Sequence, residues 1–143
     1  MLALLGLSDP YELDGRVITE VLHTKAYAQT LTAHRATVER LGAVYKQLTA
    51  PFGTFGMDTL AASTRALVSD DANDATYKAI EGNIRDLTSQ RDALVELIRT
   101  ALNKAAFGGQ PLNEQQAKRW IDQAQSLLAK AESLAEFNDD NDE

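Results

Sequence analysis

The side chains best suited to acid–base or metal chemistry in this 143-residue chain are its two histidines, His23 and His34. Their spacing of 11 residues places both on one face of a continuous helix. It also separates them by about 16 Å along the helix axis. A single zinc ion bonds its nitrogen ligands at about 2 Å and cannot span that gap. We therefore interpret both histidines as surface or boundary residues.

Two arginines, Arg35 and Arg91, occupy similar places in two otherwise apolar helical stripes. Two inward guanidinium groups could grip an anion. Alternatively, each stem lies along its helix while the charged head reaches a carboxylate or solvent. Glu39 and Glu96 are close enough in sequence to be those partners. We favour the second interpretation, because an empty anion site inside a bundle is costly.

Complete catalytic motifs are absent from the sequence. There is no glycine-rich phosphate loop, no serine nucleophile elbow and no His-Glu zinc motif. The chain has no cysteine, so it has neither a thiol nucleophile nor a disulfide. Its carboxylates are scattered along predicted helices, and none are expected to pair in a pocket. We expect Trp120 to fill an alanine-rich interface between helices rather than to stack on a ligand. An enzyme built from these residues alone is not expected, and the chain is predicted to hold no metal or cofactor.

The net charge and the hydropathy of the chain limit the classes of partner that we expect. The formal net charge is −7, and no cluster of Lys and Arg offers phosphate contacts, which argues against nucleic acid. The apolar opening, residues 1–7, is far shorter than the ~20 residues of a membrane span. It also lacks the basic region of a signal peptide. We expect a soluble protein with an acidic tail at 139–143.

Helical periodicity dominates the remaining sequence. Apolar residues alternate three and four apart over 17–49, which predicts a long packed helix with Val38 and Tyr45 in its stripe. Asp58 is a predicted N-cap for a shorter helix through Val68, with Leu60, Ala61 and Leu67 available for burial. A second long helix is predicted over 75–106, and Asn113 is expected to cap a last helix through Glu136.

The two halves look like copies. Arg35 lies 56 positions before Arg91, and Phe52-Gly53 lies 55 before Phe107-Gly108. Each half reads as a long helix, a Phe-Gly turn and a shorter helix. In each turn glycine is expected in the left-handed position, with phenylalanine covering the apolar end.

The expected fold is therefore all-α: an elongated antiparallel bundle or coiled coil of two long and two shorter helices. Three regions are expected, namely a helix–loop segment at 1–16, a bundle at 17–138 made of two hairpins (17–68 and 75–136), and the tail.

The opening residues carry two short patterns, Leu4-Leu5-Gly6-Leu7 and Asp14-Gly15-Arg16-Val17-Ile18. They resemble a stretch near the end of the catalytic domain in the alkaline phosphatase superfamily, which includes sulfatases and type I phosphodiesterases. In that superfamily a helix ending Leu-Leu-Gly-Leu precedes an Asp-Gly-Arg-x-Leu loop. The rest of the chain, including Phe55-Gly56-Met57-Asp58-Thr59-Leu60, is similar to the helical C-terminal extension of some bacterial members.

This resemblance implies a parent enzyme that hydrolyses phosphate or sulfate esters with divalent metals and a hydroxyl nucleophile, and that is often exported. Those ligands and the nucleophile belong to upstream motifs, and none matches a position here. Asp14, Gly15 and Arg16 would form a structural turn. Leu4, Leu5 and Leu7 would be covered by the catalytic core, and the chain alone would self-associate through them.

The leading hypothesis is a non-catalytic C-terminal module of such a hydrolase, acting as a spacer, cap or assembly surface. The alternative is a free-standing helical interaction protein, such as a phage or bacterial assembly subunit, that binds a partner helix.

Overall fold

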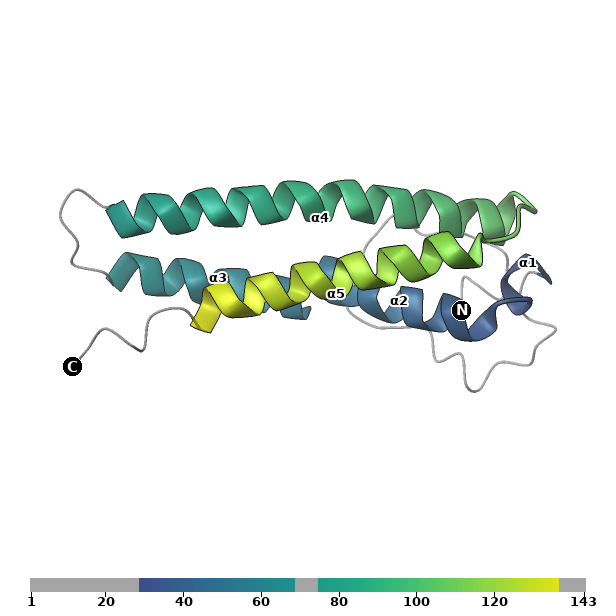
Figure 1. The fold of residues 1–143 in the computed structure, drawn as a ribbon, viewed down its shortest axis with the longest axis horizontal. Coiled ribbons are helices and arrows are strands. Elements are labelled where there is room, and N and C mark those ends of the chain that lie inside the picture. The colour runs from purple at the N-terminus through teal and green to yellow at the C-terminus, as the bar shows by residue number, and fades with distance from the viewer. Residues whose placement is uncertain (1–28, 69–74, 137–143) are drawn as a thin grey trace.

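The computed structural model describes residues 29–68 and 75–136, and these form an elongated helical bundle (Figure 1). Its elements are α1 (Gln29–Thr32), α2 (Arg35–Thr49), α3 (Thr54–Val68), α4 (Ala75–Phe107) and α5 (Glu114–Glu136). The described residues contain no strand, so the predicted all-α elongated bundle is confirmed. Two longer helices, α4 and α5, pack with the shorter α2 and α3. The expected segments at 1–16 and 139–143 lie outside the described residues.

The hairpin of α4 and α5 follows the sequence prediction closely. The 33 residues of α4 span about 50 Å. Figure 1 shows that α4 runs alongside both α2 and α3. The backbone amides of Gly108 and Gln110 both donate to the Lys104 carbonyl, at 2.9 and 3.2 Å, and so close the end of α4. Asn113 caps α5, because its side-chain oxygen accepts from the Gln116 amide at 3.0 Å.

Residues 29–68 form a broken rod rather than a hairpin, which corrects the predicted two-hairpin plan. Figure 1 shows α2 and α3 end to end beneath opposite halves of α4. At one end, Thr37 of α2 contacts Glu114, the first residue of α5. At the other end, Arg65 of α3 donates to the carbonyl of Ala135, near the last residue of α5. The rod formed by α2 and α3 is therefore parallel to α5, and both are antiparallel to α4.

The break between α2 and α3 is a tight turn at residues 50–53. Ala50 is extended, with ψ of 140°, as expected for a residue before proline. The Gln47 side chain restarts the helix by accepting from the Thr54 amide at 3.1 Å and the Thr54 hydroxyl at 2.7 Å. Gly53 is needed because an added Cβ would lie 2.6 Å from the Gln47 carbonyl oxygen. This early restart places Asp58 inside α3, so the prediction that it is the N-cap is wrong.

A second break corrects the predicted continuous helix over 17–49. The chain turns at Ala33 and His34, and His34 precedes α2 with φ of −129° and ψ of 41°. The Thr30 hydroxyl of α1 donates to the Ala105 carbonyl near the end of α4. Residues 17–28 lie outside the described residues.

The core is a single apolar column, in which α5 contacts both segments of the broken rod and α4. Its buried members come from all three rods: Leu41, Leu48, Phe55, Leu87, Leu94, Ile98, Ala105, Leu112, Ala117, Trp120, Ile121, Ala124, Leu127 and Ala131. The stripes predicted for α4 and α5 are thus confirmed. In α2 the fully buried side chains are those of Thr37, Leu41 and Leu48. Val38 and Tyr45 of the predicted stripe are partly buried and pack against this core, so the stripe is on the inward side but not at its centre.

The two phenylalanine–glycine turns differ from the expectation. Phe52 and Phe107 are 79% and 52% exposed, so neither covers the apolar end of its helix. The buried aromatic ring at the first break is that of Phe55, which is 1% exposed. Within the described residues, the one glycine with a positive φ is Gly109, at 64°.

We predict opposite effects for the same substitution at two glycines of the broken rod. Gly53→Ala forces a methyl group against backbone carbonyls and should lower the free energy of unfolding by about 1–3 kcal/mol. Gly42→Ala, within α2, meets no atom within 4 Å. It should raise stability by about 0.5–1 kcal/mol, because glycine weakens a helix interior. Urea unfolding of both variants tests this, and a neutral Gly53→Ala would contradict the described turn.

Candidate interaction surfaces

The outward side of α3 carries an apolar surface, which we call the outer α3 face: Met57, Leu60, Ala61, Thr64 and Leu67. These positions recur at helical spacing and all are exposed. Met57, Leu60 and Leu67 are 48%, 61% and 71% exposed, which is high for large apolar side chains. The prediction that Leu60, Ala61 and Leu67 are buried is therefore wrong.

The opposite side of α3 explains why these leucines stay outside. Phe55, Ala62 and Ala66 point into the bundle and are at most 3% exposed. Because Ala62 and Ala66 are small, α3 lies close to the neighbouring helices. The inward side of α3 is therefore already fully packed. The helix is therefore apolar on two sides, and only one of them serves the fold.

A hollow of about 420 Å³ extends the apolar surface from α3 onto α4. Leu60 belongs to both the hollow and the outer α3 face. The α4 wall contributes Tyr77, Ile80 and Ile84, which are half-buried, together with Glu81. The lining residues on the α3 side are Gly56, Thr59, Leu60, Ser63 and Ala66.

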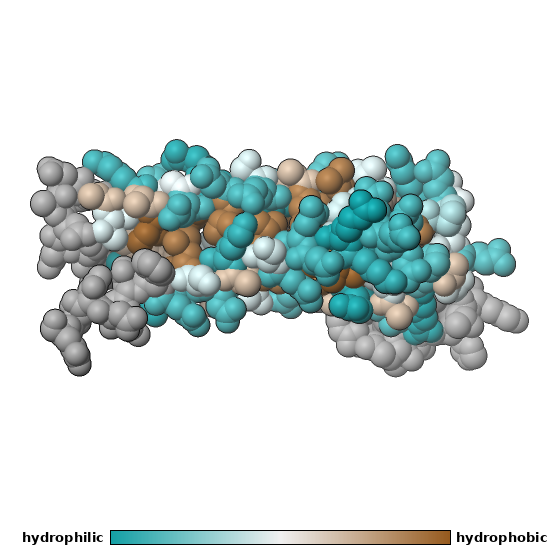
Figure 2. Space-filling view, in the orientation of Figure 1, coloured by the Kyte–Doolittle hydropathy of each residue, from teal (hydrophilic) through white to brown (hydrophobic). Residues whose placement is uncertain are grey.

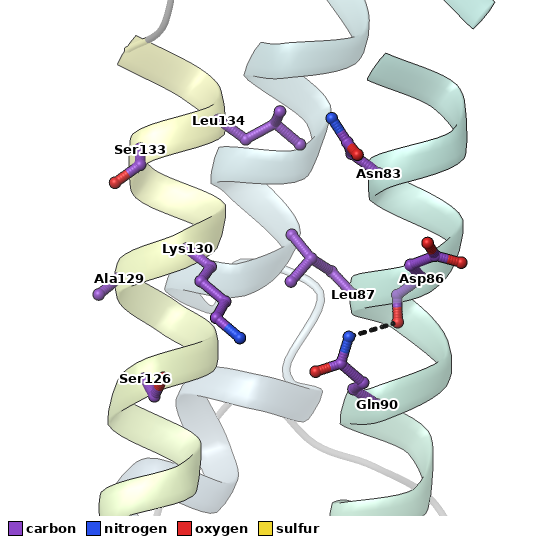
Figure 3. Close-up of a pocket in the computed structure, with 9 residues that line it drawn as sticks. All are labelled: Asn83, Asp86, Leu87, Gln90, Ser126, Ala129, Lys130, Ser133 and Leu134. Carbon is purple, nitrogen blue, oxygen red and sulfur yellow. Dashed lines mark hydrogen bonds between the residues drawn. The ribbon is translucent and has the colours of Figure 1, made fainter. Parts of the chain in front are cut away.

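A larger hollow, of about 630 Å³, lies between α4 and α5 (Figure 3). Leu87 and Leu134 point toward each other across it, and Lys130 extends from α5 into the space between the helices. On the α4 side, the Gln90 side-chain nitrogen donates to the Asp86 carbonyl at 3.3 Å. Figure 2 shows this side of the molecule, where apolar patches lie between polar side chains. The lining mixes core leucines with single polar groups and gathers no set of charges.

The two arginines do not converge on an anion. Arg35, at the start of α2, pairs with Glu39 at 2.7 Å, as predicted. Arg91, in the middle of α4, pairs with Asp92 at 2.6 Å rather than with Glu96. Its guanidinium also lies 4.9 Å from the centre of the Phe55 ring, a favourable cation–π distance.

Trp120 lies in the core at 8% exposure, beside the alanines of α5, as predicted. The other residues singled out by sequence, namely Leu4, Leu5, Leu7, Asp14, Gly15, Arg16 and His23, lie outside the described residues.

A polar cluster that the sequence did not reveal joins α2 to α5 around Glu114. This carboxylate lies 2.8 Å from the Lys118 ammonium and 3.3 Å from the imidazole of His34. It also accepts from the Thr37 hydroxyl at 3.3 Å. The hydrogen bond and charge of Lys118, followed by the charge of His34 and the Thr37 bond, lower the pKa of Glu114. His34 and Glu114 are 80 positions apart, so helical spacing alone could not pair them.

Asp58 of α3 lies toward the end of α5. One of its carboxylate oxygens is buried and finds no hydrogen-bond partner among the described residues. Burial, and then the negative charge of Glu136, raise the pKa of Asp58. Arg65 of α3 donates to the Ala135 carbonyl of α5. Both charged residues of α3, Asp58 and Arg65, therefore lie on the side of the helix that faces α5.

Within 29–68 and 75–136, no three His, Cys, Asp or Glu side chains are grouped so as to hold a metal ion. None of the helices in these ranges combines the length and apolarity needed to cross a membrane. No family model, curated protein or solved structure matches this chain.

We predict that Glu114→Gln destabilises the protein only where the carboxylate is charged. The pKa of Glu114 is lower in the folded state than its ordinary value of 4.5, so the charged carboxylate stabilises the fold at pH values above 4.5. This stabilisation is lost as the pH falls through the folded pKa. The urea midpoint of the variant should therefore be lower than that of the parent at neutral pH. The two midpoints should converge on acidification.

Glu132→Gln, at an exposed carboxylate of the same helix, is the control and should give no comparable loss at neutral pH. A Glu114→Gln deficit that persists unchanged after acid has protonated the Glu114 carboxylate of the folded parent would contradict an electrostatic origin.

Proposed function

We propose that this chain is a non-catalytic helical interaction module that binds another protein helix through the outer α3 face. The observation that carries the proposal is the apolar outward side of α3, on a helix whose inward side is already packed. Contiguous exposed apolar surface is unfavourable in water and commonly marks a contact site. Moving a leucine from full exposure to full burial gains about 1.5–3 kcal/mol. Leu60 and Leu67 are 61% and 71% exposed, so each can still gain the larger part of this free energy.

The composition of the face supports a protein partner. Charged residues are depleted at the centres of protein interfaces, and the five residues of the outer α3 face carry no charge. Thr64 is compatible with burial, because its hydroxyl already donates to the Leu60 carbonyl at 2.8 Å. An amphipathic partner helix could lie along α3 and extend over the adjoining hollow, reaching Ile80 and Ile84.

Attachment to a phosphatase-superfamily catalytic core is a second proposal, favoured by Leu4-Leu5-Gly6-Leu7 and Asp14-Gly15-Arg16. In that setting the bundle is a spacer, cap or assembly surface, and bound divalent metals belong to the upstream core. The genomic DNA before Met1 tests it. An upstream frame with metal-ligand Asp and His motifs would support it, and an unrelated gene there would contradict it.

Site-specific photo-crosslinking in the native cell tests the interaction proposal. We expect a benzoyl-phenylalanine at Thr64 to form an adduct of defined mass with another polypeptide. The same residue at Ser126, which is exposed on α5, is the control and should form none. Equal adducts at both positions, or none at Thr64, would argue against the outer α3 face as a contact surface.

A further inference from the structure

We propose that the helix bound by the outer α3 face is α3 of a second copy, so that the chain forms an antiparallel, two-fold symmetric dimer. This inference rests on the proposed function and names its partner.

Charge is the first argument for a second copy. The chain carries a formal net charge of −7, so two copies repel each other in most orientations. The sequences of α2, α4 and α5 contain charged residues along their length, whereas α3 contains only Asp58 and Arg65. Both of these lie on the side of α3 that faces α5. The outer α3 face therefore lets two identical copies meet without opposing like charges.

Self-complementary side-chain sizes are the second argument. Consider an antiparallel pair whose two-fold axis crosses the helices at the level of Ala62. In this pair, Leu60 of each copy lies opposite Thr64 of the other. Met57 likewise lies opposite Leu67. Near the axis, each large leucine thus faces a smaller threonine. At both ends of the contact, the large side chains of Met57 and Leu67 cover the helix pair. This alternation of sizes suits closely packed helices. A contact that pairs each position with its counterpart in this way is the symmetric kind that closes a dimer.

The hollow beside α3 enlarges this contact. It is continuous with the outer α3 face through Leu60, and its α4 wall presents Tyr77, Ile80 and Ile84. A helix laid on α3 thus meets a second apolar helix edge, as in a four-helix arrangement. The hollow beside α3 has one charged lining residue, Glu81. The hollow between α4 and α5 is a weaker candidate, because its rim includes two, Asp86 and Lys130, and offers no such symmetry.

Sedimentation equilibrium of the full chain is the primary test. We expect a mass of twice 15.6 kDa for the parent. The double variant Leu60→Glu, Leu67→Glu should dissociate at least about 100-fold more readily while keeping its helical circular dichroism. Leu97→Glu is the matched control, since Leu97 is 53% exposed on α4, and it should remain dimeric. Raising the ionic strength should tighten the dimer, because salt screens the repulsion between copies.

Cysteine crosslinking tests the orientation, since the chain has no cysteine of its own. Ala61→Cys places a thiol next to the two-fold axis and should form a disulfide-linked dimer on mild oxidation. Ala129→Cys, the same change at an exposed position of α5, should not.

The outcomes separate the two proposals. A parent chain that stays monomeric, or a dimer that links through Ala129→Cys and not Ala61→Cys, overturns the α3 dimer. If the Thr64 adduct in cells is then a different protein, the interaction function stands without self-association. If no Thr64 adduct forms, the interaction function falls as well.

Discussion

Burial of the small-residue stripe of α5 is the constraint on which the rest of the bundle depends. Ala117, Ala124 and Ala131 are fully buried and recur every seven residues. Small side chains at these places bring α5 close to both neighbouring rods, and Trp120 and Leu127 fill the space between the alanine layers. Because α5 contacts both α2 and α3, it also holds these two helices together across the break at residues 50–53. The first rod can therefore be interrupted without dividing the core.

The break, in turn, produces the surface to which we assign function. Restarting the helix at Thr54 turns Phe55, Ala62 and Ala66 inward and leaves Leu60 and Leu67 outside. A protein that needed these leucines only for its own fold would place polar residues there, as α5 does on its exposed side. One side of α3 thus packs inside the bundle, and the other is the surface for which we propose contact with another chain.

Sequence periodicity predicted α4 and α5 almost to the residue, because one apolar stripe and clear end signals agree in each. It failed for α3, where two apolar stripes lie on opposite sides and periodicity alone does not say which one is buried. It also failed at the break, which depends on the reach of the Gln47 side chain and on the space that Gly53 leaves free. The Glu114 cluster was missed for a related reason, since it joins residues that meet only after the rods are aligned. For the opening residues the resemblance stays a prediction.

Interrupting the first rod also divides its cooperativity. The intrahelical hydrogen bonds of α3 begin anew after the turn, so its 15 residues can open without disturbing the ladder of α2. A helix of this length is marginal on its own and is held mainly by its packed side. Amide protons of α3 should therefore exchange with solvent through a local opening that leaves α2 and α4 closed. A partner seated on its outward side would slow that opening, which links occupancy of the surface to the lifetime of the helix that bears it.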